Sequence, residues 1–385
     1  MKDEKKAPKL RFKGFTDDWE QCKLSDISEK SYEKNTDNKY STVLTNSAEY
    51  GIVKQRDFFD KDIANSSNIS GYYVVRKNYF VYNLRISNQA KFGPINRNKL
   101  NESGIMSPLY LVFTVHDIDE SFLETLFQTT TWHRFMYQNG DTGARADRFA
   151  IKDSTFMSMP IKVPSLEEQH KLALAFQKLD QTITLHEEKK CLLERLKSAL
   201  SQEMFANKNG YPAVRFEGFD KAWKQSKLGE ITKVIASKPY ISTPSTHGNY
   251  LVIQQGDKPI AGFSNSNPFK NYNNITLFGD HTLSLFKPRS PFLVASDGIK
   301  ILSPSIEMNG LFYFYELEKY KPKSEGYKRH FTILKKCKAN FPTDIDEQKL
   351  IGSLLLRIDN LITKQQLKMD KLNETKESLL QNMFI

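Results

Sequence analysis

The chain of 385 residues has few of the features that mark a secreted, membrane or metal-binding protein. Its three cysteines are Cys22, Cys191 and Cys337, and their odd number and spacing fit neither a disulfide framework nor a zinc motif. No apolar run approaches the roughly 20 residues that span a bilayer. The charged start MKDEKKAPKLRFKGF is not followed by the apolar stretch of a signal peptide. We therefore expect a reduced, cytoplasmic protein with no membrane partner.

Sequence motifs for nucleotide chemistry are also missing. There is no glycine-rich dinucleotide motif after a strand pattern and no GxxxxGK[ST] phosphate loop. Since the sequence has no Pro-Pro pair, the Asn/Asp-Pro-Pro-aromatic motif of DNA adenine methyltransferases is absent. The seven histidines fit no metal spacing, and His281 is more simply a polar loop residue than a catalytic one. We expect no catalytic site, and no metal or cofactor bound by this chain.

Positive charge and apolar residues are what the sequence has in quantity. The formal net charge is +11 and the isoelectric point is near 9.2, which favours a polyanionic partner, although many basic proteins bind no nucleic acid. Hydrophobic residues make up 39% of the chain, with 26 Phe and 17 Tyr, so sizeable cores are expected. The length suggests two or three domains.

The chain repeats itself, which sets its architecture. Residues 8–24 (PKLRFKGFTDDWEQCKL) align with residues 212–228 (PAVRFEGFDKAWKQSKL), and residues 164–205 align with residues 342–384. The regions between the repeats show no comparable similarity. The duplicated segments are predicted to serve the same scaffold role twice. The two dissimilar regions between them are predicted to have two distinct recognition roles. The matching residues include Arg11/Arg215, Trp19/Trp223, Glu168/Glu347, Gln169/Gln348, Asp180/Asp359 and Phe205/Phe384.

Both of the later repeat segments are predicted to be long helices. Ser165 before Glu168 is a capping-box pattern and Asp344 before Glu347 is a similar start signal, and neither segment has an internal proline. Apolar residues at alternating spacings of three and four form a coiled-coil stripe. We expect the two helices, each about 60 Å long, to bury these stripes against each other. The residues expected to pair the helices are Leu172, Phe176, Leu179, Ile183, Leu196, Leu200, Ile351, Leu355, Ile358, Ile362, Leu372 and Leu379.

Two polar residues, His186 and Gln365, occupy matching positions in the stripes. Polar residues there fix the register of a coiled coil at a cost in stability. Alternatively, the stripe turns to solvent at this point, and the sequence leaves both interpretations open. An antiparallel pair would give the chain pseudo-two-fold symmetry, as in proteins that read paired DNA half-sites.

The two globular regions have α+β patterns. We expect a fold of two globular domains separated by two long helices in an antiparallel coiled coil, divided into residues 1–163, 164–207, 208–341 and 342–385. Residues 119–138 are predicted to be a helix. The strand candidates, which are rich in aromatic and β-branched residues, are 71–83, 108–114, 249–254, 292–295, 300–303 and 311–315.

Basic, amide and hydroxyl side chains gather in loops of both globular regions. Lys and Arg bind phosphates, while Arg, Asn and Gln read base edges in the major groove. Each residue alone is more simply a solvated polar group, but clusters in two separate regions indicate a DNA-binding role. The residues expected to contact DNA are Arg85, Asn88, Lys91, Arg97, Arg145, Arg148, Lys270, Asn273, His281, Thr282, Lys328 and Arg329.

Together, the lead-in Arg-Phe-x-Gly-Phe…Trp…Lys-Leu, the Glu-Gln helix starts and the duplicated helices resemble type I restriction-modification specificity subunits, over essentially the whole chain. YNLRISNQAKFGPI (residues 82–95) and ITLFGDHT (residues 275–282) are similar to two classes of target recognition domain. The resemblance implies that each such domain reads half of a bipartite, asymmetric site in double-stranded DNA, and that the helices set the gap.

The resemblance also implies partners. Two modification subunits would carry S-adenosylmethionine and methylate adenine N6, and two restriction subunits would use ATP and Mg for translocation and cleavage. Two alternatives stay open: a stand-alone DNA-binding regulator, and a coiled-coil scaffold with no DNA role. Apolar surface on the outer faces of the helices would distinguish a docking subunit from a lone regulator. A steep salt dependence of DNA binding would exclude the scaffold, and activity of the purified chain would revive a hidden nuclease or methyltransferase.

Overall fold

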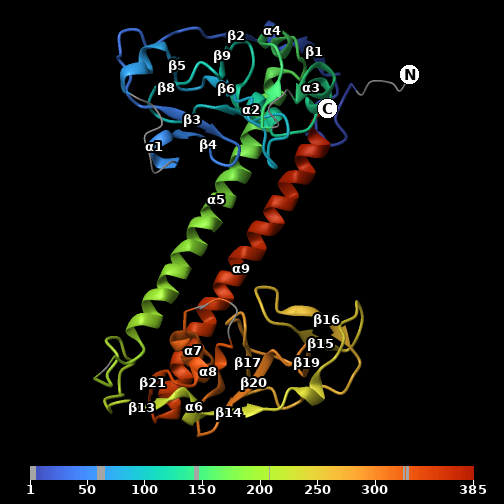
Figure 1. Ribbon diagram of the computed structural model, residues 1–385. Helices are drawn as coiled ribbons and strands as arrows, with labels where there is room; N and C mark the ends of the chain where they lie inside the picture. Colours follow the sequence, from blue (N-terminus) through green and yellow to red (C-terminus); the bar gives the residue numbers. More distant parts are fainter. Residues whose placement is uncertain (1–5, 59–65, 143–146, 208, 324–325, 327–328) are drawn as a thin grey trace. The chain divides into compact units, whose positions relative to one another are not determined.

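The computed structural model describes residues 6–58, 66–142, 147–207, 209–323, 326 and 329–385. The chain folds into two compact units. Unit 1 comprises residues 1–185 and 369–385, and unit 2 comprises residues 186–368. The boundary crosses both long helices, α5 (Leu166–Glu203) and α9 (Ile345–Met383) (Figure 1). Each helix therefore contributes to both units, and the four-segment division expected from the sequence stays a prediction.

Unit 1 is built on a four-stranded antiparallel sheet of order β2-β9-β6-β7. Helix α2 packs on this sheet, where the rings of Phe80 and Phe127 lie 6.2 Å apart. Short strand pairs, β3-β4 and β5-β8, enclose a smaller apolar cluster. The elements are β1 (Glu20–Lys23), η1 (Leu24–Asp26), β2 (Ser28–Lys30), β3 (Leu44–Ser47), β4 (Gly51–Lys54), α1 (Gln55–Phe58), η2 (Ser66–Gly71), β5 (Tyr73–Val75), β6 (Phe80–Tyr82), β7 (Ile95–Arg97), β8 (Gly104–Met106), β9 (Leu111–Val115), α2 (Glu120–Phe127), α3 (His133–Asn139), β10 (Asp141–Thr142), β11 (Phe149–Ala150), α4 (Asp153–Met157) and β12 (Pro160–Val163).

Unit 2 also has a four-stranded antiparallel sheet, of order β14-β20-β17-β18, and a three-stranded sheet β16-β15-β19 in which β15 and β19 are parallel. Helix α7 packs against the first sheet, since Phe312 and Phe278 belong to one buried cluster. The elements are β13 (Lys224–Lys227), α6 (Leu228–Ile231), β14 (Thr232–Ile235), η3 (Lys238–Tyr240), β15 (Tyr250–Ile253), β16 (Ile260–Ser264), β17 (Thr276–Gly279), β18 (Leu285–Phe286), β19 (Phe292–Val294), β20 (Ile299–Pro304), α7 (Gly310–Tyr320), α8 (Phe331–Leu334) and β21 (Lys338–Phe341). Both units therefore mix helices and strands, which confirms the α+β class.

The two four-stranded sheets share one topology, although their sequences do not align. Numbered along the chain, the strands of each sheet lie in the spatial order first, fourth, second, third. A helix, α2 or α7, follows the fourth strand in each unit. Each unit also has a matching two-stranded ladder, in which Glu20 pairs with Val163 and Lys224 with Phe341. The duplication therefore extends into the globular regions as a shared scaffold.

The duplicated lead-in segments are held to the starts of the long helices by buried ion pairs. The guanidinium of Arg11 donates two 2.7 Å hydrogen bonds to the carboxylate of Glu168, and Arg215 donates to Glu347 at 2.8 and 2.9 Å. Half of the expected capping box is present, because the Glu168 N–H donates to Ser165 Oγ at 3.4 Å. The Glu168 side chain pairs with the lead-in instead of closing that box.

The neighbouring glutamines tie the long helices to the sheet-covering helices. Gln169 Oε1 accepts from the backbone N–H of Asp119, the N-cap of α2, at 2.9 Å. Gln348 Oε1 accepts from the N–H of Asn309, the N-cap of α7, at 2.7 Å. The recurring Glu-Gln pair therefore holds two different elements of each unit to one helix start.

A group of three aromatic rings closes the core of each unit. In unit 1, Phe384, which directly follows α9, stacks on Phe122 at 5.6 Å and lies edge-on to Trp19 at 6.1 Å. The core of unit 1 therefore contains residues from the start of α5 and from the end of the α9 segment. The equivalent residues of unit 2 are Phe205, Phe312 and Trp223.

Within unit 1, the two long helices run in opposite directions. Phe176 of α5 packs against Phe384 at 5.7 Å, and one turn later Asp180 forms a 2.8 Å ion pair with Lys376. The order of these contacts along the two helices is reversed, as antiparallel segments require.

Within unit 2, the other parts of α5 and α9 are also antiparallel. His186 Nδ1 and Gln365 Oε1 lie 2.7 Å apart, and Lys197 Nζ lies 2.9 Å from Asp359. Gln365 is 4% exposed, so at this point the stripe does not turn to solvent, and a polar pair lies between the helices.

The predicted pairing residues divide into three groups by burial. Leu172 and Phe176 belong to the core cluster of unit 1, and Ile351 and Leu355 to that of unit 2, so these residues pack with the globular cores. The prediction for Leu196 is wrong, because it is 45% exposed. The remaining predicted residues are buried (Ile183, Ile358) or partly buried (Leu179, Leu200, Ile362, Leu372, Leu379).

Three sequence predictions of secondary structure need correction. Residues 311–315 lie in helix α7 rather than in a strand, because Asn309 Oδ1 accepts from the N–H groups of Leu311 and Phe312 and starts a helix. The helix expected over 119–138 is broken into α2 and α3. The strand expected over 71–83 is interrupted by a turn at Asn78, which has φ of 68°.

Candidate nucleic-acid interface

In unit 1, the segment that leaves β6 pairs with the segment before β11. The Ile86 N–H donates to Asp147 O at 3.0 Å, and the Phe149 N–H donates to Leu84 O at 2.8 Å. Arg85 and Arg148 face each other in the resulting antiparallel bridge. Two loops separated by about 60 residues of sequence therefore meet, and the structure brings together two of the predicted arginines.

The basic groups at this junction are largely free to reach a ligand. The Arg85 side chain is 65% exposed and its guanidinium lies 3.8 Å from the exposed carboxylate of Asp147, a distance and exposure at which an ion pair contributes little. Lys91 is exposed above the ring of Phe92, at 5.8 Å from the centroid. Asn88 lies exposed in the tight turn between Ser87 and Ala90.

Aromatic packing beneath this surface adds a residue that the sequence did not indicate. The ring of Phe92 meets Phe149 at 5.1 Å and His133 of α3 at 5.0 Å. Burial, together with the positive charge of Lys91, lowers the pKa of His133, so its imidazole is neutral at pH 7. Gly93 has φ of 84°, and a Cβ there would lie 2.0 Å from Asn83 O. Only glycine fits at position 93, where the backbone passes close to Asn83.

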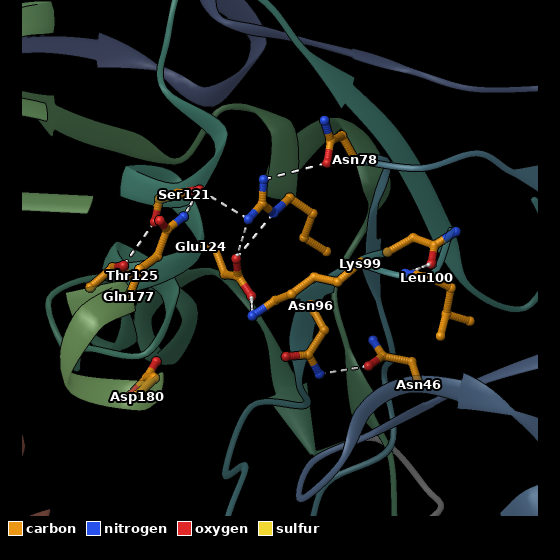
Figure 2. A network of polar contacts seen from close by, with 12 residues as sticks. Asn46, Asn78, Asn96, Lys99, Leu100, Ser121, Glu124, Thr125, Gln177 and Asp180 are labelled. Atoms are coloured by element: carbon orange, nitrogen blue, oxygen red, sulfur yellow. Dashed lines mark hydrogen bonds and ion pairs between the residues drawn. The ribbon is translucent and has the colours of Figure 1, made fainter. Parts of the chain in front are cut away.

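Arg97 does not belong to this surface, and its prediction as a DNA contact is wrong. Its guanidinium donates to Glu124 Oε2 at 2.8 and 3.0 Å and to Ser121 Oγ at 3.0 Å, and the side chain is 11% exposed. Lys99 shares Glu124 at 2.6 Å, and Gln177 of α5 donates to Ser121 at 2.7 Å (Figure 2). Arg97 therefore links β7 to α2, and Gln177 links α2 to α5.

In unit 2, the segment that leaves β17 meets the start of α8. Buried Asp280 accepts from the Phe331 N–H through Oδ1 at 2.9 Å, and its backbone oxygen accepts from the His330 N–H at 2.9 Å. The predicted residues His281 and Thr282 directly follow Asp280 at this junction, and exposed Arg329 directly precedes His330. His330 itself is fully buried.

Gln255 joins the same junction and was missed by the sequence analysis. Its Oε1 accepts from the His281 N–H at 3.2 Å. Gln255 follows β15 and precedes His281 by 26 residues, so only the tertiary pairing reveals the contact.

Lys270 and Asn273 are not brought to this junction. They precede β17, whereas His281 and Thr282 follow its end. Both are exposed, and the backbone oxygen of Asn273 accepts from Lys287 Nζ at 2.7 Å. Burial lowers the pKa of Lys287 to about 8. Arg145 and Lys328 lie outside the described residues.

The two junctions occupy the same place in the shared topology. Both are formed where the chain leaves the second strand of the four-stranded sheet in chain order, β6 or β17, and meets the segment that follows α2 or α7. Different side chains are displayed at equivalent positions, with arginines in unit 1 and histidine and threonine in unit 2.

A family model described as "Type I restriction modification DNA specificity domain" matches residues 16–195 and again residues 220–372. The chain belongs to this family. The two matches correspond to the two copies of the shared scaffold. No curated protein matches the chain in sequence.

A solved structure has a fold similar to that of this chain. A crystal structure of a type I restriction-modification system S subunit from M. genitalium is 13% identical, with a TM-score of 0.64, and the match covers 98% of this chain and 99% of that one. At this identity the likeness concerns the fold alone. An HsdS subunit from Thermoanaerobacter tengcongensis is 17% identical, with coverage of 95% and 96% and a TM-score of 0.41.

Metal ions, membranes and thiol chemistry are three other possibilities on which the described part of this specificity-family chain bears. Among those residues, no group of three His, Cys, Asp or Glu side chains is placed to hold a metal ion. No described helix is both long and apolar enough to cross a bilayer. The burial of the Cys22 and Cys337 thiols raises their pKa values, which disfavours the reactive thiolate form.

Proposed function

We propose that this chain is the DNA-recognition subunit of a type I restriction-modification complex and reads a bipartite, asymmetric site in double-stranded DNA. The observation that carries the proposal is the pair of equivalent junctions, each of which gathers polar side chains from separate loops. The net charge of +11 fits a polyanionic ligand. Because the two junctions differ in their side chains, we expect two unlike half-sites.

The chemistry of each junction suits a different part of DNA recognition. Arg85, Arg148 and Lys91 in unit 1 provide donors for phosphates or for guanine edges. His281 and Thr282 in unit 2 provide shorter groups for base edges, with Arg329 for the backbone. Lys270 and Asn273 would form a separate contact.

The long helices fit the role of a spacer in an antiparallel coiled coil. Helix α5 has 38 residues, which corresponds to about 57 Å at 1.5 Å per residue. One turn of DNA is about 34 Å long, so separated half-sites are geometrically reasonable. The contact between the repeat equivalents His186 and Gln365 supports a two-fold relation of the helices, as the sequence predicted.

An apolar stripe on the exposed side of α5 supports docking of partner subunits. Leu174, Leu185, Leu192 and Leu196 are each 45% to 67% exposed. Their spacings of 11, 7 and 4 residues place them on one helix face. A lone regulator would need only the buried stripe, so this face favours the complex over the stand-alone regulator or scaffold. Two modification and two restriction subunits would supply S-adenosylmethionine, ATP and Mg, while this chain would be non-catalytic.

Methylome sequencing of a host that expresses this chain with and without its modification subunit tests the proposal. We expect a bipartite, asymmetric N6-methyladenine motif that depends on both proteins. Replacing residues 30–160 with those of another family member should change one half of that motif and leave the other. No motif despite a soluble complex would favour the regulator or scaffold, and a change in both halves would contradict the modular arrangement.

A further inference from the structure

Three segments of unit 2 meet around a hollow beside His281. The turn after β15, the segment after β17 and the turn before β20 converge there, and the Asp280 N–H donates to Gly298 O at 2.9 Å. The hollow has a volume of about 250 Å³. Gln254, Gln255, Asp257 and Ser284 supply its polar lining, and Ile253, Leu277, Phe286 and Ile299 are among its apolar residues.

The side-chain amide of Gln255 is oriented by its neighbours. The backbone N–H of His281 is a donor, so the Gln255 oxygen must face it, and the two lie 3.2 Å apart. The Nε2 group is therefore directed the other way, toward Gly298, where an added Cβ would lie 2.8 Å from it. The absence of a side chain at position 298 leaves Nε2 room. Within the described residues, no hydrogen bond uses this Nε2.

The charge and lining of the hollow indicate what it would receive. The carboxylate of Asp257 contributes to the lining, and it would repel a phosphate. A base edge is neutral, so the carboxylate would not exclude it, and the polar lining offers partners for its donors and acceptors. Thr282 and Ser284, which hydrogen-bond to each other at 2.8 Å, add small polar groups at the same side.

We propose that Gln255 is a base-reading residue of the unit 2 half-site. Its Nε2 donates a hydrogen bond to an acceptor on a base edge in the major groove, which is N7 or O6 of guanine, N7 of adenine or O4 of thymine. His281 and Thr282 flank this contact. The inference rests on the proposed DNA-recognition function and adds to it the residue and the hydrogen-bond polarity.

An isosteric substitution tests the polarity directly. In Gln255→Glu, one carboxylate oxygen still accepts from the His281 N–H, so the junction stays anchored, while the other presents an acceptor where the wild type presents a donor. We expect the preferred base at one position of one half-site to change to one with an amino group, cytosine or adenine. The discrimination should be about ten-fold or more, and the other half-site should be unchanged.

Asn265→Asp is the matched control, because it adds the same charge in unit 2 at an exposed residue that does not line the hollow. Asn265 Oδ1 accepts from the Asn249 N–H at 2.9 Å, and a carboxylate keeps that bond, so its substitution should leave the base profile as in the wild type. The measurement is the methylation motif of a host carrying each variant with the modification subunit, followed by competition binding of the purified complex to duplexes that differ at the affected position.

The outcomes separate this inference from the function on which it rests. A changed base at one position with Gln255→Glu, but not with Asn265→Asp, supports the assignment. An unchanged motif with Gln255→Glu, or an equal effect of both variants, overturns the assignment while the recognition function stands. If the wild-type chain yields no motif, both are overturned.

Discussion

His186 and Gln365 are equivalent residues of the two repeat segments, and their side chains meet at 2.7 Å. Contact between repeat equivalents arises when two like helices pair with two-fold symmetry. The ion pairs on either side follow the same rule, because Asp180 with Lys376 and Asp359 with Lys197 are exchanged by the repeat.

The polar pair His186–Gln365 should determine the register of the two helices more than it stabilises them. We expect His186→Leu alone to destabilise by about 1–3 kcal/mol, because it leaves the buried amide of Gln365 without its partner. The double substitution to leucine should recover most of that loss, since two apolar groups replace two polar ones. A double-mutant cycle in urea unfolding measures the coupling, and equal losses in the single and double variants would contradict it.

Glu316 should make unit 2 less stable as the pH rises. The residue is fully buried in α7, and neither carboxylate oxygen has a hydrogen-bond partner among the described residues. Burial raises its pKa well above the ordinary 4.5, so the folded protein keeps a proton that the unfolded chain releases. This contribution to stability is complete below about pH 4.5 and is lost as the pH rises toward the folded-state pKa.

Substitution of Glu316 by leucine should remove that pH dependence. Leu126 of α2 lies seven residues after its N-cap, as Glu316 does in α7, so unit 1 shows that leucine suits the position. We expect a gain on the order of 1–3 kcal/mol at pH 8 and a smaller gain at pH 5. Unfolding at both pH values checks this, and an equal gain at each would show that Glu316 is not protonated in the folded state.

Substitution of Arg85 should affect DNA binding, whereas substitution of Arg97 should affect the stability of unit 1. We expect Arg85→Ala to weaken DNA binding and to reduce the salt slope by about 0.9 if it removes one phosphate contact, with unchanged stability. Arg97→Ala should instead destabilise unit 1 by about 2 kcal/mol. That is less than an isolated buried pair would cost, because Lys99 still compensates Glu124. Salt-dependent binding and thermal unfolding of both variants test this, and the reverse pattern would restore Arg97 as a DNA contact.

The repeats were visible in the sequence, but their contacts were not. Arg11 and Glu168 are 157 residues apart in the sequence. No local sequence pattern indicates that these two residues form an ion pair. The same limit explains Arg97, whose pattern as a loop arginine gave no sign of Glu124. The aromatic run 311–315 has the composition of a strand, and the sequence pattern alone predicted one. It forms part of helix α7 because Asn309 caps the start of that helix.

Each long helix should stabilise the unit that receives its end. We expect Phe384→Ala to lower the protection of unit 1 and Phe205→Ala that of unit 2, each by about 3–5 kcal/mol, the usual cost of emptying a buried phenylalanine site. Native-state hydrogen exchange resolves the two units. Leu192→Ala, at a residue that is 67% exposed, is the control. Loss of protection in the opposite unit would contradict the assignment of each ring to its core.

Lengthening both helices should lengthen the gap in the DNA site. A heptad inserted after Thr184 and another after Thr363 keeps the apolar stripe in phase and adds about 10 Å to each helix, which corresponds to about 3 base pairs at roughly 3.4 Å each. Insertion into α5 alone should abolish the motif, because the partner helix would then be too short to match its contacts. The methylation motif reports the gap, and an unchanged gap with both insertions would mean that the helices do not set the spacing.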